Sequence, residues 1–502
     1  MNTVDSYQKS LNLIILKATS YMGAASSLNV LFGLIRMKFA ALYIGVAGVG
    51  LLTNYRVIQT FIGSLVGLGI RQSAVRDIAS ALANHDKNSV GEIIQSLRIL
   101  TLIIGLIGAL TIYFLSPIIS SFVFNTNLYA YQLSFLAIAI FFGNLTGGQL
   151  ALLQGMGQTK KLALFNILSG FFNLMVSIYL FITFGKNGVI ASMVALSIIE
   201  FLIALVMVNK IPFRRIKLTL KTFIKRVNSM VVLGFSFMIT GLGASLLAIV
   251  INSLITKNIS LESVGIYAAS TALTTIFITF ILSAMSTDFY PRLTSLINDT
   301  NKAIDLINIQ TQIGICLVLP GLFATAAFAE YLVPILYSRE FENASSLIPL
   351  MVLGCLPRII SWPLGYIMLA KAASKLIIIS EILLNTINFL VVFFLIQKIG
   401  IWAPVLGLLI VRLFHIIICF IIGRHLINFY WSKKLLSIIL ISFITLFLYI
   451  GTLYFLSGAI KIIFGAIATL IITIICVKNI ISIIELPLKY INLFKKFKLI
   501  GN

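Results

Sequence analysis

The sequence has 502 residues, of which 60% are hydrophobic and only 10% are charged. About a quarter of the residues in a soluble domain are charged, so this composition excludes a disordered chain, a coiled coil and an ordinary cytosolic enzyme. The mean hydropathy of +1.09 is typical of a polytopic α-helical membrane protein. In such a protein the net charge of +23 indicates the positive-inside rule and attraction to anionic lipids, so we expect no nucleic-acid partner.

Fourteen apolar segments are long enough to cross a bilayer as helices, since about 20 residues span about 30 Å of hydrocarbon. In chain order they lie at residues 11–35, 45–70, 93–115, 128–152, 162–183, 188–208, 231–256, 264–288, 308–330, 346–369, 375–397, 402–423, 435–456 and 459–480. We therefore expect an all-α polytopic membrane protein in five parts: an N-terminal six-helix lobe, a basic cytoplasmic connector, a C-terminal six-helix lobe, an extra helix pair and a basic cytoplasmic tail. The predicted bounds of these parts are residues 1–208, 209–230, 231–423, 435–480 and 481–502.

The 37 Lys and Arg residues are distributed unevenly along these spans. With the N-terminus inside, 26 of them fall in inner segments and 7 in outer segments, of which Arg36 is the first. Because cytoplasmic loops carry the excess of Lys and Arg, this distribution predicts that both termini face the cytoplasm. The remaining 4 cations lie within predicted spans.

The chain also repeats itself at an offset of 215 residues. This shift places Val49-Gly50 on Val264-Gly265, Lys160 on Lys375, Asn173 on Asn388 and Gly185 on Gly400. An even number of spans separates the two copies, so both halves share one orientation. We expect them to be related by an axis along the membrane normal, with the last two spans outside the repeat.

The four cations within predicted spans are the candidate binding residues: Lys17, Arg56, Arg358 and Arg412. An ionised side chain at the centre of a span costs at least about 2.5 kcal/mol, so it persists where it faces water, a counter-charge or a substrate. Gln59 shares a helix face with Arg56, and His415 shares one with Arg412, which favours a polar, cationic lumen. The alternative is that these cations pair with acids or reach the membrane surface.

Acids and amides form a second polar set within the spans. Glu200 and Glu381 either bind a coupling ion or neutralise an arginine. Asn385 and Asn388 share a face with Glu381, and the other half matches them with Asn166 and Asn173. The histidines and cysteines lack metal-ligand spacing, and no glycine-rich phosphate loop follows a strand. We therefore expect a protein that is not an enzyme and needs no cofactor or metal.

Several short motifs resemble those of one family. They are Gly45–Gly50, Asn54–Arg56, Gly67–Gly69, Leu153–Lys161, Val264–Tyr267, Tyr290–Leu293 and Leu369–Lys371. With these motifs the chain resembles the Wzx-type O-antigen and polysaccharide flippases of the MOP exporter superfamily. The resemblance implies two pseudo-symmetric six-helix bundles around a central cavity, in a bacterial cytoplasmic (inner) membrane. Many members have twelve spans, and the extra helix pair resembles the arrangement in lipid II flippases.

The resemblance implies transport of an undecaprenyl-pyrophosphate-linked oligosaccharide by alternating access. Arg56, Arg358 and Arg412 would bind the pyrophosphate, and Lys17 would lie near a lateral portal. The expected partners are this lipid-linked substrate, anionic membrane lipids and the polysaccharide polymerase or chain-length machinery. The alternatives are a lipid II, teichoic-acid-type or multidrug exporter of the same fold, and a membrane glycosyltransferase or polymerase.

Overall fold

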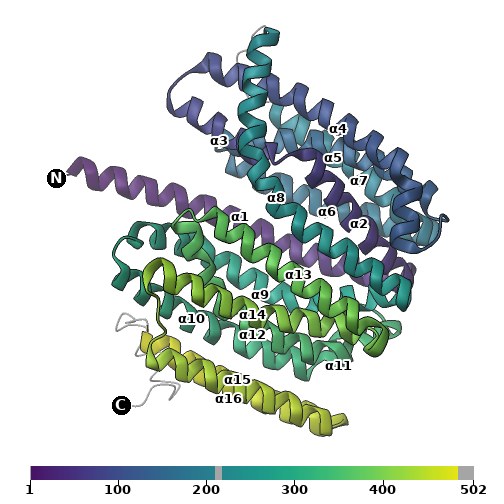
Figure 1. Ribbon diagram of the computed structural model, residues 1–502, viewed down its shortest axis with the longest axis vertical. Helices are drawn as coiled ribbons and strands as arrows, with labels where there is room; N and C mark the ends of the chain where they lie inside the picture. The colour runs from purple at the N-terminus through teal and green to yellow at the C-terminus, as the bar shows by residue number, and fades with distance from the viewer. Residues whose placement is uncertain (1, 210–217, 484–502) are drawn as a thin grey trace. The chain divides into compact units, whose positions relative to one another are not determined.

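The computed structural model describes residues 2–209 and 218–483, all of them in helices and the short connections between helices (Figure 1). Side chains are described from Tyr21 onward, except at residues 210–217, 233, 236, 237, 239, 240 and 287 and after residue 483. The side chain of Lys17 and the basic tail at 484–502 therefore lie outside the described residues. The chain forms two compact units, Met1–Gly265 and Ile266–Asn502.

Within residues 2–209 and 218–265, the first unit contains eight α-helices and the start of a ninth. They are α1 (Asn2–Tyr43), α2 (Gly45–Gly67), α3 (Ile70–Ala83), α4 (Lys87–Phe124), α5 (Ala130–Gly155), α6 (Thr159–Phe184), α7 (Gly188–Asn209), α8 (Leu220–Asn258) and the start of α9 (Leu261–Leu296), with a short 3-10 helix, η1 (Gly185–Asn187). Leu68 and Gly69 take positive φ angles of 47° and 62°, which end α2 and begin α3 in a new direction. Asp86 starts α4, because its carboxylate accepts a hydrogen bond of 2.9 Å from the backbone N–H of Ser89.

As far as residue 483, the second unit contains the rest of α9 and seven further α-helices. They are α10 (Thr300–Ala327), α11 (Ala329–Leu336), α12 (Asn343–Ala370), α13 (Ser374–Ile399), α14 (Trp402–Ile427), α15 (Lys433–Phe455) and α16 (Gly458–Ile483), with the 3-10 helix η2 (Arg339–Phe341). Helix α14 packs against α12 and α13, while α15 and α16 pack against α10. The C-terminal helix pair is thus part of this unit's packing.

Twelve segments of the described chain are long and apolar enough to cross a membrane. The difference from fourteen predicted spans has two sources. The segment Thr159–Asn209 contains both α6 and α7, joined through η1. Helix α2 is missing from the twelve because Asn54, Arg56 and Gln59 near its middle lower its mean hydropathy.

The predicted repeat of 215 residues is reproduced in the backbone. Helices α6 and α13 begin and end at positions that differ by this offset, and both are followed by a glycine of positive φ, Gly185 at 54° and Gly400 at 59°. The turn before each helix is also repeated, with Gly157 at a φ of 66° and Ala372 at 51°. The backbone hydrogen bonds of Gln158 to Leu153 and of Ala373 to Met368 correspond as well. The sequence repeat is therefore a repeat of structure.

Helix α8, the seventh predicted span, packs against α2, α3 and α4 in the first unit. The backbone of Gly234 approaches the carbonyl oxygen of Leu68 so closely that a Cβ there would lie 2.2 Å from it. Arg226 forms an ion pair of 2.9 Å with Glu92 of α4. The compact unit therefore ends after Gly265, whereas the sequence places the start of the C-terminal lobe at 231. The end of the predicted connector, from Leu220, is the start of α8.

Two glycines that the repeat relates to one another meet where α2 crosses the start of α9. A Cβ on Gly50 would lie 2.2 Å from the carbonyl oxygen of Leu261, and a Cβ on Gly265 would lie 2.3 Å from that of Val46. Val46 and Leu261 differ by the same offset of 215, so the contact is reciprocal. Only residues without a side chain allow the two backbones to come this close.

We expect Gly50→Ala to destabilise the protein by about 1–3 kcal/mol, because the new methyl group must push two backbones apart. Gly33→Ala in α1 is the matched control, since a Cβ at Gly33 would meet no atom within 4 Å. Thermal unfolding of the purified variants in detergent measures the difference. Equal melting temperatures for both variants would contradict the close crossing.

Candidate functional site

The second unit holds two of the predicted arginines together. Arg358 of α12 and Arg412 of α14 line one small cavity of about 30 Å³. Thr271, Thr274 and Thr275 of α9 line the same cavity, so hydroxyl groups lie around the two guanidinium groups. The guanidinium groups give the cavity the hydrogen-bond donors that an anion requires, whereas the hydroxyls of Thr274 and Thr275 already donate to backbone carbonyls of α9.

The charges of this cavity are only partly balanced. Arg358 and Arg412 repel each other, and Glu381 of α13 attracts Arg412. Neither guanidinium has a carboxylate within 4 Å among the residues that the structure describes. Two like charges without a close counter-ion form a site that favours a bound anion.

His415 lies on α14 beside the two arginines and is affected electrostatically by both. Its Nδ1 forms a hydrogen bond of 2.8 Å with the hydroxyl of Ser361 on α12. This contact joins the two helices that carry Arg358 and Arg412, and it fixes the orientation of the imidazole ring. His415 is thus part of the predicted cluster in the second unit.

The acid and amides of α13 lie in different surroundings. Glu381 is exposed, and Asn385 is half-buried one turn further along the helix. Asn388 is buried against Gly407 of α14, and its Oδ1 accepts no hydrogen bond from any residue that the structure describes. Among the predicted polar residues of α13, Glu381 is the one that interacts electrostatically with an arginine of the cavity, Arg412.

The first unit places Arg56 near an acid. Arg56 is exposed on α2, and Glu200 of α7 attracts it electrostatically. The Glu200 carboxylate accepts a hydrogen bond from the hydroxyl of Ser169 on α6, so three helices contribute to this group. This geometry favours the counter-charge alternative for Glu200. Gln59 and Asn166 are half-buried on α2 and α6.

Asn173 contacts a cation that the sequence analysis assigns to an outer loop. Arg36 lies within the candidate span Tyr21–Tyr43, because α1 continues to Tyr43 instead of ending near residue 35. Its side chain is only 6% exposed, and its Nη1 donates a hydrogen bond of 3.2 Å to Oδ1 of Asn173. The assignment of Arg36 to an outer loop is therefore wrong. The apolar run that follows Arg36 and Lys38 is the signal that could have corrected it.

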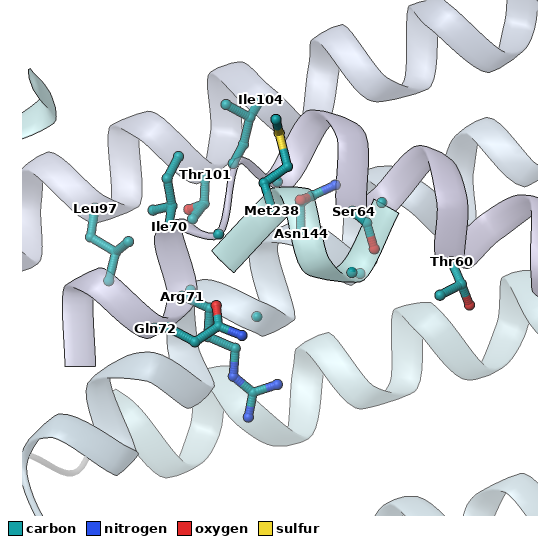
Figure 2. Close-up of a pocket in the computed structure, with 17 residues that line it drawn as sticks. Thr60, Ser64, Ile70, Arg71, Gln72, Leu97, Thr101, Ile104, Asn144 and Met238 are labelled. Atoms are coloured by element: carbon teal, nitrogen blue, oxygen red, sulfur yellow. The ribbon is translucent and has the colours of Figure 1, made fainter. Parts of the chain in front are cut away.

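A larger cavity of about 370 Å³ lies in the first unit, where α2, α3, α4, α5 and α8 meet (Figure 2). Its polar lining includes Thr60, Ser64, Gln72, Asn144 and Arg71. Arg71 is the one charged residue among the side chains that line the cavity within the described part of the chain. Partial burial lowers the pKa of the Arg71 guanidinium below its usual range, but the group stays protonated at neutral pH.

The sequence places Thr60, Gly63 and Gly67 on the same face of α2 as Arg56, which favours a polar lumen, but it does not predict the part of this cavity that α3, α4, α5 and α8 contribute. The spacing of Gly63 and Gly67 suggests only helix packing, yet both glycines line the cavity. A Cβ on Gly63 would meet no atom within 4 Å, and one on Gly67 would come no closer than 3.7 Å to Asn144. A further glycine cluster at 143–148, which the cavity also uses, is the sequence signal that could have revealed it.

No group of three or more His, Cys, Asp or Glu side chains within residues 21–209 and 218–483 is arranged to hold a metal ion. The polar side chains of the two cavities are arginine, hydroxyl, amide and thiol groups, and apolar side chains such as Ile70, Met238, Met351 and Val405 complete the linings. Such groups bind and orient a ligand, and they provide no nucleophile paired with a base.

Comparison with known sequences identifies the family. The profile described as "Polysaccharide biosynthesis protein" matches residues 47–346, which is more than half of the chain. The chain belongs to the polysaccharide biosynthesis protein family. A curated relative is the lipid III flippase of Escherichia coli (strain K12), which is 23% identical over 378 residues, covering 73% of this chain and 88% of the relative. The lipid III flippase of Shigella flexneri matches to the same extent.

Solved structures share the fold of this polysaccharide biosynthesis protein. The lipid II flippase MurJ in an inward closed conformation has a TM-score of 0.67 at 15% identity, covering 92% of this chain and 99% of MurJ. An inward-facing multidrug resistance MATE transporter of the MOP superfamily has a TM-score of 0.66 at 16% identity, covering 80% of this chain and 94% of the transporter. The fold is thus a MATE- and MurJ-like multi-pass membrane fold. The predicted resemblance is therefore confirmed at the level of the polysaccharide biosynthesis protein family and of this fold.

We expect Arg36→Ala to lower the free energy of unfolding by about 1–3 kcal/mol, because the substitution removes a buried hydrogen-bond donor from Asn173. Lys186→Ala is the control, since Lys186 is exposed and belongs to the same predicted outer group. Thermal unfolding in detergent compares the two. If Arg36 were an outer-loop residue, both variants would unfold like the unsubstituted protein.

Proposed function

We propose that this protein is a flippase that moves an undecaprenyl-pyrophosphate-linked oligosaccharide across the cytoplasmic membrane by alternating access. The observation that carries the proposal is the pairing of Arg358 and Arg412 in one cavity with no carboxylate within 4 Å among the described residues. A pyrophosphate is a compact, multiply charged anion. Arginine binds phosphate oxygens through two parallel hydrogen bonds, which gives both strength and orientation.

The threonines of α9 add polar surface to this cavity, and the two arginines supply the hydrogen-bond donors for the anion, since the hydroxyls of Thr274 and Thr275 donate to backbone carbonyls of α9. We also propose Arg56 of the first unit as a binding residue, with Glu200 as its counter-charge. Lys17 is proposed to lie near the portal through which the lipid tail stays in the bilayer. Translocation breaks no covalent bond, so a site of this composition needs no catalytic base.

The comparisons support a lipid-linked saccharide as the substrate class. The family takes part in polysaccharide biosynthesis, and the curated relatives are flippases for lipid III. The cation-rich cavity is consistent with a substrate that carries negative charge. The partners of this chain would then be the lipid-linked saccharide, anionic lipids at the basic inner segments and the machinery that polymerises the exported units.

The proposal includes fourteen spans in a bacterial inner membrane, with both termini in the cytoplasm. The excess of Lys and Arg in the inner segments supports this orientation. The match to MurJ covers 92% of the chain and the match to the MATE transporter 80%, which supports a C-terminal helix pair in addition to two six-helix lobes. The close packing of α15 and α16 against α10 agrees with this arrangement.

A multidrug or other lipid exporter is the second candidate, because the fold is also that of a multidrug resistance transporter. Such a function would depend on Glu200 or Glu381 as the site of ion coupling. Glu200 already accepts a hydrogen bond from Ser169 and lies near Arg56, which favours a structural counter-charge.

We expect Arg358→Ala and Arg412→Ala each to reduce polysaccharide export at least about tenfold, because each removes a donor group for the pyrophosphate. Arg412→Lys should restore only part of the activity, since lysine keeps the charge but lacks the two-pronged geometry. Complementation of a strain lacking the chromosomal copy, read out as surface polysaccharide, measures the effect. Arg424→Ala, at an exposed position near the end of α14, is the matched control.

Full export by both alanine variants would contradict the proposed site. Loss of export in Glu200→Gln or Glu381→Gln, together with drug sensitivity and full activity of the arginine variants, would favour the ion-coupled exporter.

A further inference from the structure

The 370 Å³ cavity of the first unit stays open because of glycines that pack against nothing. A Cβ on Gly63, Gly143 or Gly147 would meet no atom within 4 Å. Two glycines of α4 and α5 behave differently, since a Cβ on Gly108 would lie 2.9 Å from Ile140 and one on Gly148 would lie 2.7 Å from Thr101. Helix packing therefore explains Gly108 and Gly148. It does not explain the open glycines Gly63, Gly143 and Gly147.

The internal repeat indicates what the open glycines replace. At the offset of 215 residues, Gly143 corresponds to Arg358 and Gly147 to Trp362. In the second unit these two large side chains occupy the equivalent helix face, and Trp362 packs against Phe289 and Tyr366. The same position of the fold is thus filled and charged in one half, and empty and almost neutral in the other half.

The groups that face the open cavity suit a neutral, hydroxyl-rich ligand. Figure 2 shows Ser64 and Asn144 beside Met238, while Arg71 and Gln72 come from the start of α3. Hydroxyl and amide groups both donate and accept hydrogen bonds, and a guanidinium group adds up to five donors. The side chains of Ile70 and Ile104 give the same cavity apolar walls. A sugar ring presents both kinds of surface, hydroxyl groups at its edge and C–H groups on its faces.

The cavity is less suited to the other parts of a lipid-linked saccharide. A pyrophosphate requires several cations, whereas Arg71 is the one cation among the described lining residues. A polyprenyl tail requires an apolar surface, whereas hydroxyl, amide and exposed peptide groups contribute much of this lining. The volume of about 370 Å³ lies at the lower end of the range of about 300–1,000 Å³ for ligand pockets, which fits a short saccharide.

We propose that this cavity, bounded by Gly143, Gly147, Asn144, Ser64 and Arg71, is a saccharide subsite, and this inference rests on the flippase function proposed above. The carbohydrate of the lipid-linked substrate binds in the first unit through hydroxyl and amide contacts. At the equivalent positions of the second unit, Arg358 and Trp362 take the place of Gly143 and Gly147.

The test compares the binding of two lipids to the purified full-length protein in nanodiscs. One is undecaprenyl pyrophosphate, and the other is undecaprenyl pyrophosphate carrying the saccharide, extracted from the producing cells. The unsubstituted protein should bind the saccharide-bearing lipid at least about tenfold more tightly. Gly147→Leu fills the cavity and should abolish this preference while leaving the affinity for the bare lipid unchanged.

Gly451→Leu in α15 is the matched control, because a Cβ there also meets no atom within 4 Å, and it should keep the preference. A preference that persists in Gly147→Leu would overturn the subsite. Equal losses for both lipids would also overturn it, since the cavity would then hold the lipid pyrophosphate. If the unsubstituted protein bound neither lipid, the flippase function would be contradicted together with the subsite. If it bound both lipids but Gly147→Leu did not change the preference, only the subsite would be contradicted.

Discussion

Two like charges held together in a membrane-embedded cavity are the constraint on which the functional arrangement depends. Arg358 and Arg412 repel each other across a small space, and the only acid acting on Arg412, among the described residues, is the exposed Glu381. Such a pair is costly in the absence of a ligand. A bound anion would relieve this repulsion, which is why we propose that the second unit binds the phosphate groups of the ligand.

The internal repeat explains how a second, different surface arises in the same chain. Equivalent turns around Gly157 and Ala372, and equivalent helix ends at Gly185 and Gly400, give both halves the same backbone. Side chains at equivalent positions then differ in size and charge. Gly143 and Gly147 leave a cavity where Arg358 and Trp362 fill the space, so one backbone supports an open polar pocket and a closed cationic one.

Composition and periodicity were enough to predict the membrane class, the helices and the repeat, because the hydrocarbon core imposes length and apolarity on every span. The same logic predicted that Arg358, Arg412 and His415 lie in polar surroundings, since ionisable side chains in spans need them. It was wrong for Arg36, because an arginine near the end of an apolar run does not reveal where the helix stops. The spacing of glycines alone did not predict the cavity of the first unit, because glycines on one helix face have the same spacing whether a neighbouring helix packs against them or they line an open space. The packing of α8 with α2, α3 and α4 depends on tertiary contacts that one sequence does not encode locally.

The central claim is that the guanidinium groups of the second unit hold the pyrophosphate of a lipid carrier. Native mass spectrometry of the purified protein with undecaprenyl pyrophosphate and undecaprenyl monophosphate tests it most directly. We expect preferential binding of the pyrophosphate lipid, and loss of that preference in the double variant Arg358→Ala/Arg412→Ala. An equal preference in the unsubstituted protein and in the double variant would contradict it.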